Sequence, residues 1–227
     1  ASIVITMSSE TTKAVADLLS VQNMTRHAVG WEKITALRGS FDGGTLIGLS
    51  KGLTGITDYD QIMEYATQYE QHITGNVTDK TNGNNTTPDL SAILYTKDVR
   101  VGDIYGNNTD AIPFDLQPDI IASYFANTKN TPYSIYPILT TTSVYNHEVG
   151  SIMYSLVQMI THNISQLAYL TANREGLDTI VFSGSFISGK DMITDTLSKQ
   201  IQLWSNKKCK SFFIRQDGYL GALGVIE

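Results

Sequence analysis

One stretch, residues 147–170, constrains the fold of this chain more than any other. Apolar side chains recur there at steps of three and four, with serine and glutamine side chains mostly between them. The apolar positions are Val149, Ile152, Met153, Leu156, Ile160, Ile164 and Leu167. This spacing predicts a long helix with one buried face, and Gly176 is placed to end it near the C-cap.

Strand-like and helix-like segments alternate after this helix. Runs of β-branched and aromatic residues predict strands at 179–182 and 211–214. Residues 192–204 predict a helix between them, and residues 217–218 predict a turn into a final helix. The apolar run Ser2–Thr6 predicts another short, buried strand. The order of these elements predicts an α/β protein.

The N-terminal half carries weaker signals. Residues 38–45 are rich in glycine and predict a turn that leads into a short helix from Leu46. Thr57 or Asp58 can cap a second helix, and residues 119–125 predict a single helix turn. Residues 72–90 are mostly Thr, Asn and Gly with almost nothing to bury, which predicts a polar surface insertion.

Composition excludes several classes of protein. The chain has 227 residues and a formal net charge of −6, so it lacks the positive surface that binds nucleic acid. Its single cysteine, Cys209, excludes an intramolecular disulfide and a multi-cysteine zinc cluster. There is no apolar run of about 18 residues and no basic, apolar leader at the start. We therefore expect a cytoplasmic protein with no membrane span.

Two glycine-rich motifs are candidate ligand contacts. Gly43-Gly44-Thr45 precedes a predicted helix, where glycine lets the backbone approach a phosphate and helix N–H groups favour an anion. The structural alternative is a plain tight turn. Gly218, Gly221 and Gly224 are spaced by three, which permits either a nucleotide-base contact or close packing of a helix.

Other candidate residues match a hydrolase site or a metal site only in part. Gly48-Leu49-Ser50-Lys51-Gly52 matches the G-x-S-x-G motif of hydrolases, with His147 or His162 as partner, but no buried strand precedes it. His162 itself is predicted to be a packed helix histidine. Asp98, Asp103 and Asp110 lack the calcium-loop spacing and are predicted to be solvated, so no metal site is expected.

In combination, the motifs resemble those of the eukaryotic-type (type II) pantothenate kinases. Each is similar to a family segment, and together they keep the family's order from about Gly43 to the C-terminus. The matching segments are Gly43-Gly44-Thr45-Leu46-Ile47-Gly48-Leu49, Leu53-Thr54-Gly55, Asp103-Ile104-Tyr105-Gly106, Ile120-Ile121-Ala122-Ser123-Tyr124-Phe125, Asn163-Ile164, Phe182-Ser183-Gly184-Ser185-Phe186, Leu203-Trp204-Ser205 and Gly218-Tyr219-Leu220-Gly221-Ala222-Leu223-Gly224.

The resemblance implies a fold and an activity. The family belongs to the actin-like, ribonuclease H-like superfamily of acetate and sugar kinases. Residues 1–227 would then form a C-terminal lobe, with a mixed sheet flanked by helices and an insertion at 72–90. The implied reaction is phosphorylation of pantothenate with ATP and Mg²⁺, giving 4'-phosphopantothenate in the first step of coenzyme A biosynthesis.

Site residues follow from the resemblance position by position. The nucleotide-contacting positions are Ser9, Gly43, Gly44, Gly184, Gly218 and Gly221. The positions lining the pocket for pantothenate or a CoA thioester are Tyr105, Ile120, Ile121, Ala122 and Trp204. That pocket lies partly at a dimer interface in the family, so a homo- or heterodimer is implied. No catalytic residue is assigned, because the family's catalytic glutamate and phosphate-binding lysine would lie upstream.

Three positions depart from the family pattern. Ser8 and Glu10 replace glycines of a second phosphate-binding turn, in which Ser9 is retained, and Asp42 replaces another glycine. A carboxylate beside the γ-phosphate disfavours ATP unless a metal bridges the two charges. Two readings stay open: a kinase lobe in which a carboxylate contacts magnesium, and a catalytically degenerate regulatory or structural subunit that pairs with an active kinase.

Overall fold

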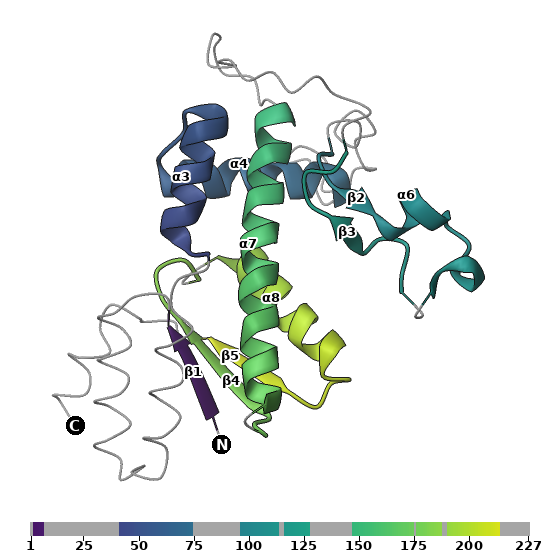
Figure 1. Cartoon of the computed structure of the whole chain (residues 1–227). Coiled ribbons are helices and arrows are strands. Elements are labelled where there is room, and N and C mark those ends of the chain that lie inside the picture. The colour runs from purple at the N-terminus through teal and green to yellow at the C-terminus, as the bar shows by residue number, and fades with distance from the viewer. Residues whose placement is uncertain are drawn as a thin grey trace, which may run out of the picture. The chain divides into compact units, whose positions relative to one another are not determined.

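The computed structural model describes residues 2–6, 41–74, 96–113, 116–127, 147–174, 176–187 and 190–213 (Figure 1). The chain divides into two compact units, one formed by residues 1–46 and 160–227 and the other by residues 47–159. The division falls within helix α3 (Gly43–Thr54) and within the long helix α7 (His147–Arg174).

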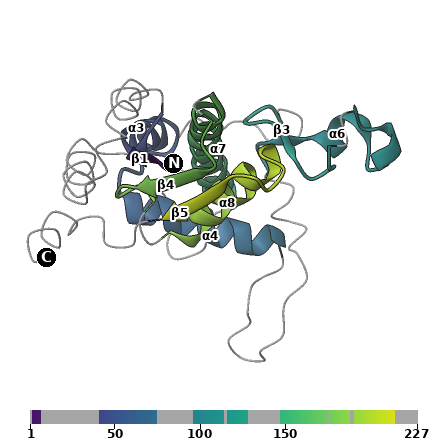
Figure 2. The ribbon, with the colours of Figure 1, turned by 90° about the horizontal axis from the view of Figure 1, so that it is seen from below.

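The first unit holds a parallel sheet of three described strands. These are β1 (Ser2–Thr6), β4 (Thr179–Ser183) and β5 (Lys210–Phe213), in the order β1-β4-β5. Parallel neighbours require a crossover connection, and α8 (Asp191–Trp204) supplies it between β4 and β5. Figure 2 shows β4 and β5 side by side, with α8 next to β5.

The core of this unit forms where α8 meets the sheet. Ile193, Leu197 and Ile201 recur every four residues on α8, and all three are fully buried. On β4, Phe182 is fully buried and stacks on Phe213 of β5, with ring centroids 5.5 Å apart. Burial of each such side chain stabilises the fold by about 1.5–3 kcal/mol.

Helix α7 ends as its sequence predicts. Gly176 has a φ of +69°, the left-handed conformation that favours glycine after a helix. Leu177 N–H donates to the carbonyl of Ala172 at 2.8 Å, which satisfies one of the last helical acceptors. The sequence placed the start of α7 correctly at His147 and its end four residues short of Arg174.

The second unit combines helices with a small antiparallel ribbon. Asp58 caps α4 (Tyr59–Thr74) by accepting the N–H of Gln61 at 2.8 Å. β2 (Val99–Arg100) pairs with β3 (Ile121–Ser123). Between these strands lie α6 (Val101–Tyr105) and the short 3-10 helix η2 (Thr109–Ala111).

Packing in this unit joins α4 to the N-terminal half of α7. The buried face of α4 consists of Ile62, Met63, Ala66 and Tyr69. The ring of Tyr69 lies 5.6 Å from that of Tyr154 on α7. The steps of three and four among these positions place them on one face of the helix.

The structure confirms the α/β class and corrects three local predictions. The end of the predicted glycine-rich turn is helical, because α3 begins at Gly43. Residues 121–123 form a strand and not a helix turn, because pairing with β2 supplies hydrogen-bond partners for an extended backbone. Helix α4 continues through residues 72–74 of the predicted insertion, and residues 75–90 lie outside the described residues.

The finer fold assignment stays a prediction. In the described part of the chain, the parallel strands and the antiparallel pair lie in separate sheets. The actin-like lobe therefore rests on the family resemblance, as does the division into one lobe with an insertion. The predicted final helix after residue 217 lies outside the described residues.

Candidate functional site

The first candidate site lies at the carboxyl edge of the parallel sheet. Gly184 directly follows β4 and has a φ of +131°, a backbone conformation that residues other than glycine rarely adopt. β1 ends at Thr6, which pairs with Ser183, so both strands end at this edge. Open α/β sheets bind ligands outside the carboxyl ends of their strands.

Helix α3 begins beside the same edge. A Cβ atom added at Gly43 would lie 3.8 Å from Cδ2 of Phe186, in the turn that follows β4. The structure therefore brings the predicted nucleotide contacts Gly43 and Gly184 to one region. Ser9, Gly218 and Gly221 lie outside the described residues.

Asp42 occupies the N-terminal end of α3. Its Oδ1 accepts the backbone N–H of Thr45 at 3.0 Å and faces the Thr45 hydroxyl at 3.4 Å. The same carboxylate oxygen would lie 3.2 Å from a Cβ atom added at Gly44. A helix N-terminus favours an anion, and here that place is taken by a side chain of the protein itself.

The second candidate site is the ribbon formed by residues 99–105 and 118–123, which belongs to the other unit. Val101 N–H donates to the carbonyl of Ile120 at 2.9 Å, and Gly102 N–H donates to that of Pro118 at 2.8 Å. A Cβ atom at Gly102 would lie 3.1 Å from Cβ of Pro118, so glycine permits this close approach. The ribbon thus carries four of the five predicted pantothenate contacts, namely Tyr105, Ile120, Ile121 and Ala122.

The ribbon presents apolar surface to solvent. Ile104 is 56% exposed and Tyr105 is 49% exposed. Ala122 is also exposed, and Ile120 and Ile121 are half-buried. Large exposed apolar side chains that lie close together are typical of a binding surface.

The fifth predicted contact, Trp204, belongs to the unit that contains the parallel sheet. It is the last residue of α8 and is half-buried. Its ring centroid lies 5.2 Å from that of His162 and 6.1 Å from that of Tyr169, both on α7. Loss of solvent lowers the pKa of His162 below its usual value, so the imidazole beside Trp204 is neutral near pH 7.

Ser50 has the position of a packing residue. It lies within α3 and is fully buried, and its hydroxyl donates to the carbonyl of Ile56 at 2.7 Å. A hydrolase nucleophile instead needs an exposed turn between a strand and a helix. This placement argues against the hydrolase alternative.

The prediction that Asp98 is solvated was wrong. Its side chain is 2% exposed, and burial raises its pKa to about 6, although hydrogen bonds from Phe125 and Ser155 and the charge of Arg100 oppose that rise. Asp103 is exposed, as predicted, and accepts the N–H of Arg100 at 2.7 Å. No sequence signal distinguished the buried aspartate from the exposed one.

Neither a metal cluster nor a spanning helix is found in the described residues. They hold no group of three or more His, Cys, Asp or Glu side chains able to bind a metal ion. Within the same part of the chain, none of the helices combines the length and the apolar character needed to cross a membrane.

Comparison with known proteins gives the family. The sequence profile of the family described as Fumble matches residues 94–227. The chain belongs to the Fumble family. The matched range includes the ribbon, all of α7, Trp204 and the strands β4 and β5, whereas Gly43 and Gly44 precede it.

Individual relatives of this Fumble-family chain carry two kinds of name. Pantothenate kinase 1 of Arabidopsis thaliana is 34% identical over 186 residues, which cover 82% of the chain and 40% of that protein. Pantothenate kinase of Schizosaccharomyces pombe is 31% identical, covering 82% of the chain and 38% of that protein. The 4'-phosphopantetheine phosphatase of Mus musculus is 29% identical, covering 82% of the chain and 18% of that protein.

These relatives confirm the resemblance to pantothenate kinases. The chain spans less than half the length of each of the three.

Proposed function

We propose that this chain supplies the C-terminal lobe of a pantothenate kinase acting in the cytoplasm. The complete enzyme transfers a phosphoryl group from Mg²⁺-bound ATP to pantothenate and forms 4'-phosphopantothenate. The observation that carries the proposal is the similarity to relatives named pantothenate kinase over 82% of the chain.

The ribbon supports a role in binding pantothenate. Pantothenate carries an apolar gem-dimethyl group among its polar groups, and binding sites for small molecules are lined mainly by apolar and aromatic side chains. Ile104 and Tyr105 offer such a surface, and Tyr105 adds a hydroxyl group for a polar contact. Trp204 stays a contact that the family resemblance alone implies, and a second subunit forms part of the pocket wall in this proposal.

The carboxyl edge of the sheet supports a role in holding the nucleotide. Gly184, which has a positive φ, follows β4, and the half-buried Gly43 begins α3 beside it. The nucleotide phosphates fit this edge incompletely, because the Asp42 carboxylate already accepts a backbone N–H at the N-terminal end of α3. A bare phosphate does not fit at that helix end while the Asp42 side chain occupies it.

The position of Asp42 favours a second candidate function. A subunit that has lost its own catalysis could keep the fold and the pantothenate surface while it pairs with an active kinase. The relative named as a phosphatase also indicates that this sequence type occurs in proteins with names other than kinase. The two candidates differ in what the nucleotide edge binds.

The deciding experiment measures 4'-phosphopantothenate formed from pantothenate and Mg²⁺-bound ATP by the purified chain. Turnover by the chain alone supports the kinase and makes the upstream segment dispensable. Turnover only after addition of an active family kinase or of the upstream segment supports a lobe or partner subunit. Failure under every condition, with the chain folded, overturns the kinase proposal.

A charge substitution tests the nucleotide edge directly. Asp42→Asn keeps an oxygen that can cap α3 but removes the negative charge, and we expect ATP to bind about fivefold more tightly, on the order of 1 kcal/mol. Asp58→Asn is the matched control, since Asp58 caps α4 in the same way. Unchanged ATP affinity in Asp42→Asn would exclude a phosphate at this helix end.

A further inference from the structure

The carboxylate of Asp98 joins three segments of the second unit. Its Oδ1 accepts the backbone N–H of Phe125 at 3.1 Å, and its Oδ2 accepts the hydroxyl of Ser155 at 2.9 Å. Asp98 directly precedes β2, Phe125 follows β3, and Ser155 lies on α7. One buried carboxylate therefore connects both strands of the ribbon to a long helix.

Phe125 adopts a conformation that needs such support. Its φ is +56°, which is unfavourable for residues other than glycine. Such a conformation persists only where contacts with the surrounding structure stabilise it. The hydrogen bond from its N–H to Asp98 is a contact of this kind. Asp98 thus fixes the direction in which the chain leaves β3.

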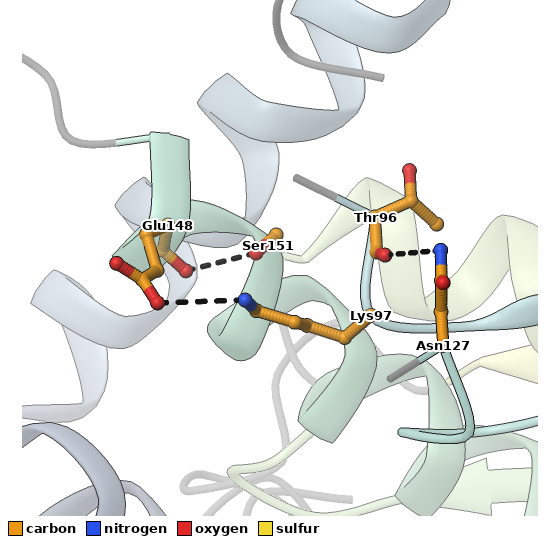
Figure 3. Close-up of polar contacts among 5 residues, drawn as sticks. All are labelled: Thr96, Lys97, Asn127, Glu148 and Ser151. Carbon is orange, nitrogen blue, oxygen red and sulfur yellow. Dashed lines mark hydrogen bonds and ion pairs between the residues drawn. The ribbon is translucent and has the colours of Figure 1, made fainter. Parts of the chain in front are cut away.

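A second set of contacts holds the same segments together (Figure 3). Asn127 donates its side-chain amide to the carbonyl of Thr96 and its backbone N–H to that of Lys97, both at 2.9 Å. The ammonium of Lys97, which is fully buried, lies 3.5 Å from Oε1 of Glu148 on α7. The segment before β2 is consequently anchored to α7 through Lys97 as well as through Asp98.

The ribbon depends on these anchors for its position. β2 has two residues and β3 has three, and a ribbon that short is at best marginally stable in water by itself. Tyr105 follows β2 through α6, whereas Ile121 and Ala122 belong to β3. A change at Asp98 therefore moves several predicted pantothenate contacts at once without touching any of them.

We propose that Asp98 is a positioning residue for pantothenate: by holding Phe125 and Ser155 it sets the ribbon that carries Tyr105, Ile121 and Ala122. The inference rests on the proposed function. Asp98 itself makes no contact with pantothenate in this proposal.

The surroundings of Asp98 determine the pH at which its carboxylate gains a proton. The groups that face it are Arg100 on β2, Tyr69 on α4, Tyr124 after β3, Tyr154 on α7, and the nearby Lys97–Glu148 pair. Burial raises the pKa of Tyr69 to about 12 and those of Tyr124 and Tyr154 still further, so these tyrosines stay neutral. Asp98, with a pKa of about 6, gains its proton as the pH falls below that value.

Calorimetric titration with pantothenate at pH 7.5 and pH 5.5 tests the proposal. Because burial raises the pKa of Asp98 in the anchored ribbon, protonation favours the anchored state, and we expect no weakening of pantothenate binding at pH 5.5 that arises from Asp98. Asp98→Ala removes both acceptor oxygens and should weaken binding at both pH values, whereas Asp98→Asn keeps an oxygen that can accept the N–H of Phe125 and should recover part of the affinity. Ser155→Ala removes only the contact with α7 and should weaken binding less than Asp98→Ala. Asp195→Asn, at an exposed carboxylate of α8 outside the ribbon, should behave as wild type.

Hydrogen exchange separates this proposal from the proposed function. Amides of residues 121–127 should exchange faster in Asp98→Ala or Asp98→Asn than in wild type, with α4 unchanged. Unchanged exchange in folded variants overturns the positioning role, and faster exchange with unchanged pantothenate affinity overturns its link to substrate. If wild type binds no pantothenate, the proposed function fails and the substrate role of Asp98 fails with it, while the exchange result still reports on the anchor.

Discussion

The ring of His162 packs against the ring of Trp204, with centroids 5.2 Å apart and planes inclined by 58°. The contact joins the middle of α7 to the last residue of α8. Tyr169, two turns further along α7, contacts the same indole at 6.1 Å. The orientation of Trp204 thus depends on two rings of one helix.

Replacement of His162 should change how stability depends on pH. Loss of solvent lowers the pKa of His162 in the folded chain, so the unfolded chain binds a proton more readily as the pH falls through 6.5. This group therefore contributes stability above its unfolded pKa and loses it towards lower pH. We expect the difference in melting temperature between pH 7.5 and pH 5.5 to be more positive in wild type than in His162→Asn.

Asp98 changes the pH dependence of stability in the direction opposite to His162. The contribution of His162 is therefore obtained as the difference between wild type and His162→Asn. Its raised pKa makes the folded chain bind a proton more readily between pH 6 and its unfolded value of 3.8. An identical pH dependence in His162→Asn and wild type would contradict the environment described for His162.

Truncation of Ser50 should destabilise the chain without affecting any chemistry. Ser50→Ala removes the donor to the Ile56 carbonyl, and a buried polar group left without a partner costs about 1–3 kcal/mol. Thermal unfolding measures the loss. A fluorophosphonate probe should leave wild-type Ser50 unlabelled, and labelling at that residue would revive the hydrolase alternative.

A methyl group at Gly102 should disturb the ribbon. Its Cβ atom would lie 2.7 Å from Oδ1 of Asn107 and 3.1 Å from the carbonyl oxygen of Pro118, so the backbone near residue 118 must shift. We expect Gly102→Ala to lower the melting temperature and weaken pantothenate binding.

Gly48→Ala is the matched control for Gly102→Ala. Gly48 lies within α3, and its added Cβ would meet nothing within 4 Å. Alanine in a helix interior is favoured over glycine by about 0.5–1 kcal/mol, so this variant should be more stable than wild type. Equal effects of the two substitutions would show that the approach of Gly102 to Pro118 is unimportant.

The two members of the Lys97–Glu148 pair should respond unequally to substitution. Lys97 is fully buried, whereas the side chain of Glu148 is 18% exposed. Glu148→Gln leaves the ammonium of Lys97 buried but removes the charge of the carboxylate that faces it. We expect this variant to lower the free energy of unfolding by about 3 kcal/mol. Lys97→Met places an apolar side chain in the buried position, and the carboxylate of Glu148 keeps its access to water. This variant should therefore lower the free energy of unfolding by less than Glu148→Gln does. Denaturant unfolding of both variants gives the order, and the reverse order would contradict this account.

Local patterns predicted most of the described elements. The apolar stripe of α7, the β-branched and aromatic run of β4 and the Asp58 cap of α4 each have a physical cause within a few residues of chain. The family resemblance likewise rests on short motifs in order, and the Fumble match confirms it. The sequence also showed that Asp42 replaces a family glycine. It did not predict that the carboxylate of Asp42 accepts a hydrogen bond from Thr45.

Long-range contacts decided the remainder. Residues 121–123 became a strand because β2, about twenty residues earlier, supplies backbone partners that no local pattern shows. Asp98 and Asp103 are alike in sequence, yet one is buried against Ser155 of α7, 57 positions away, while the other caps an exposed helix. Burial and the pKa that follows from it are properties of the assembled fold, because they depend on which distant segments exclude water from a side chain.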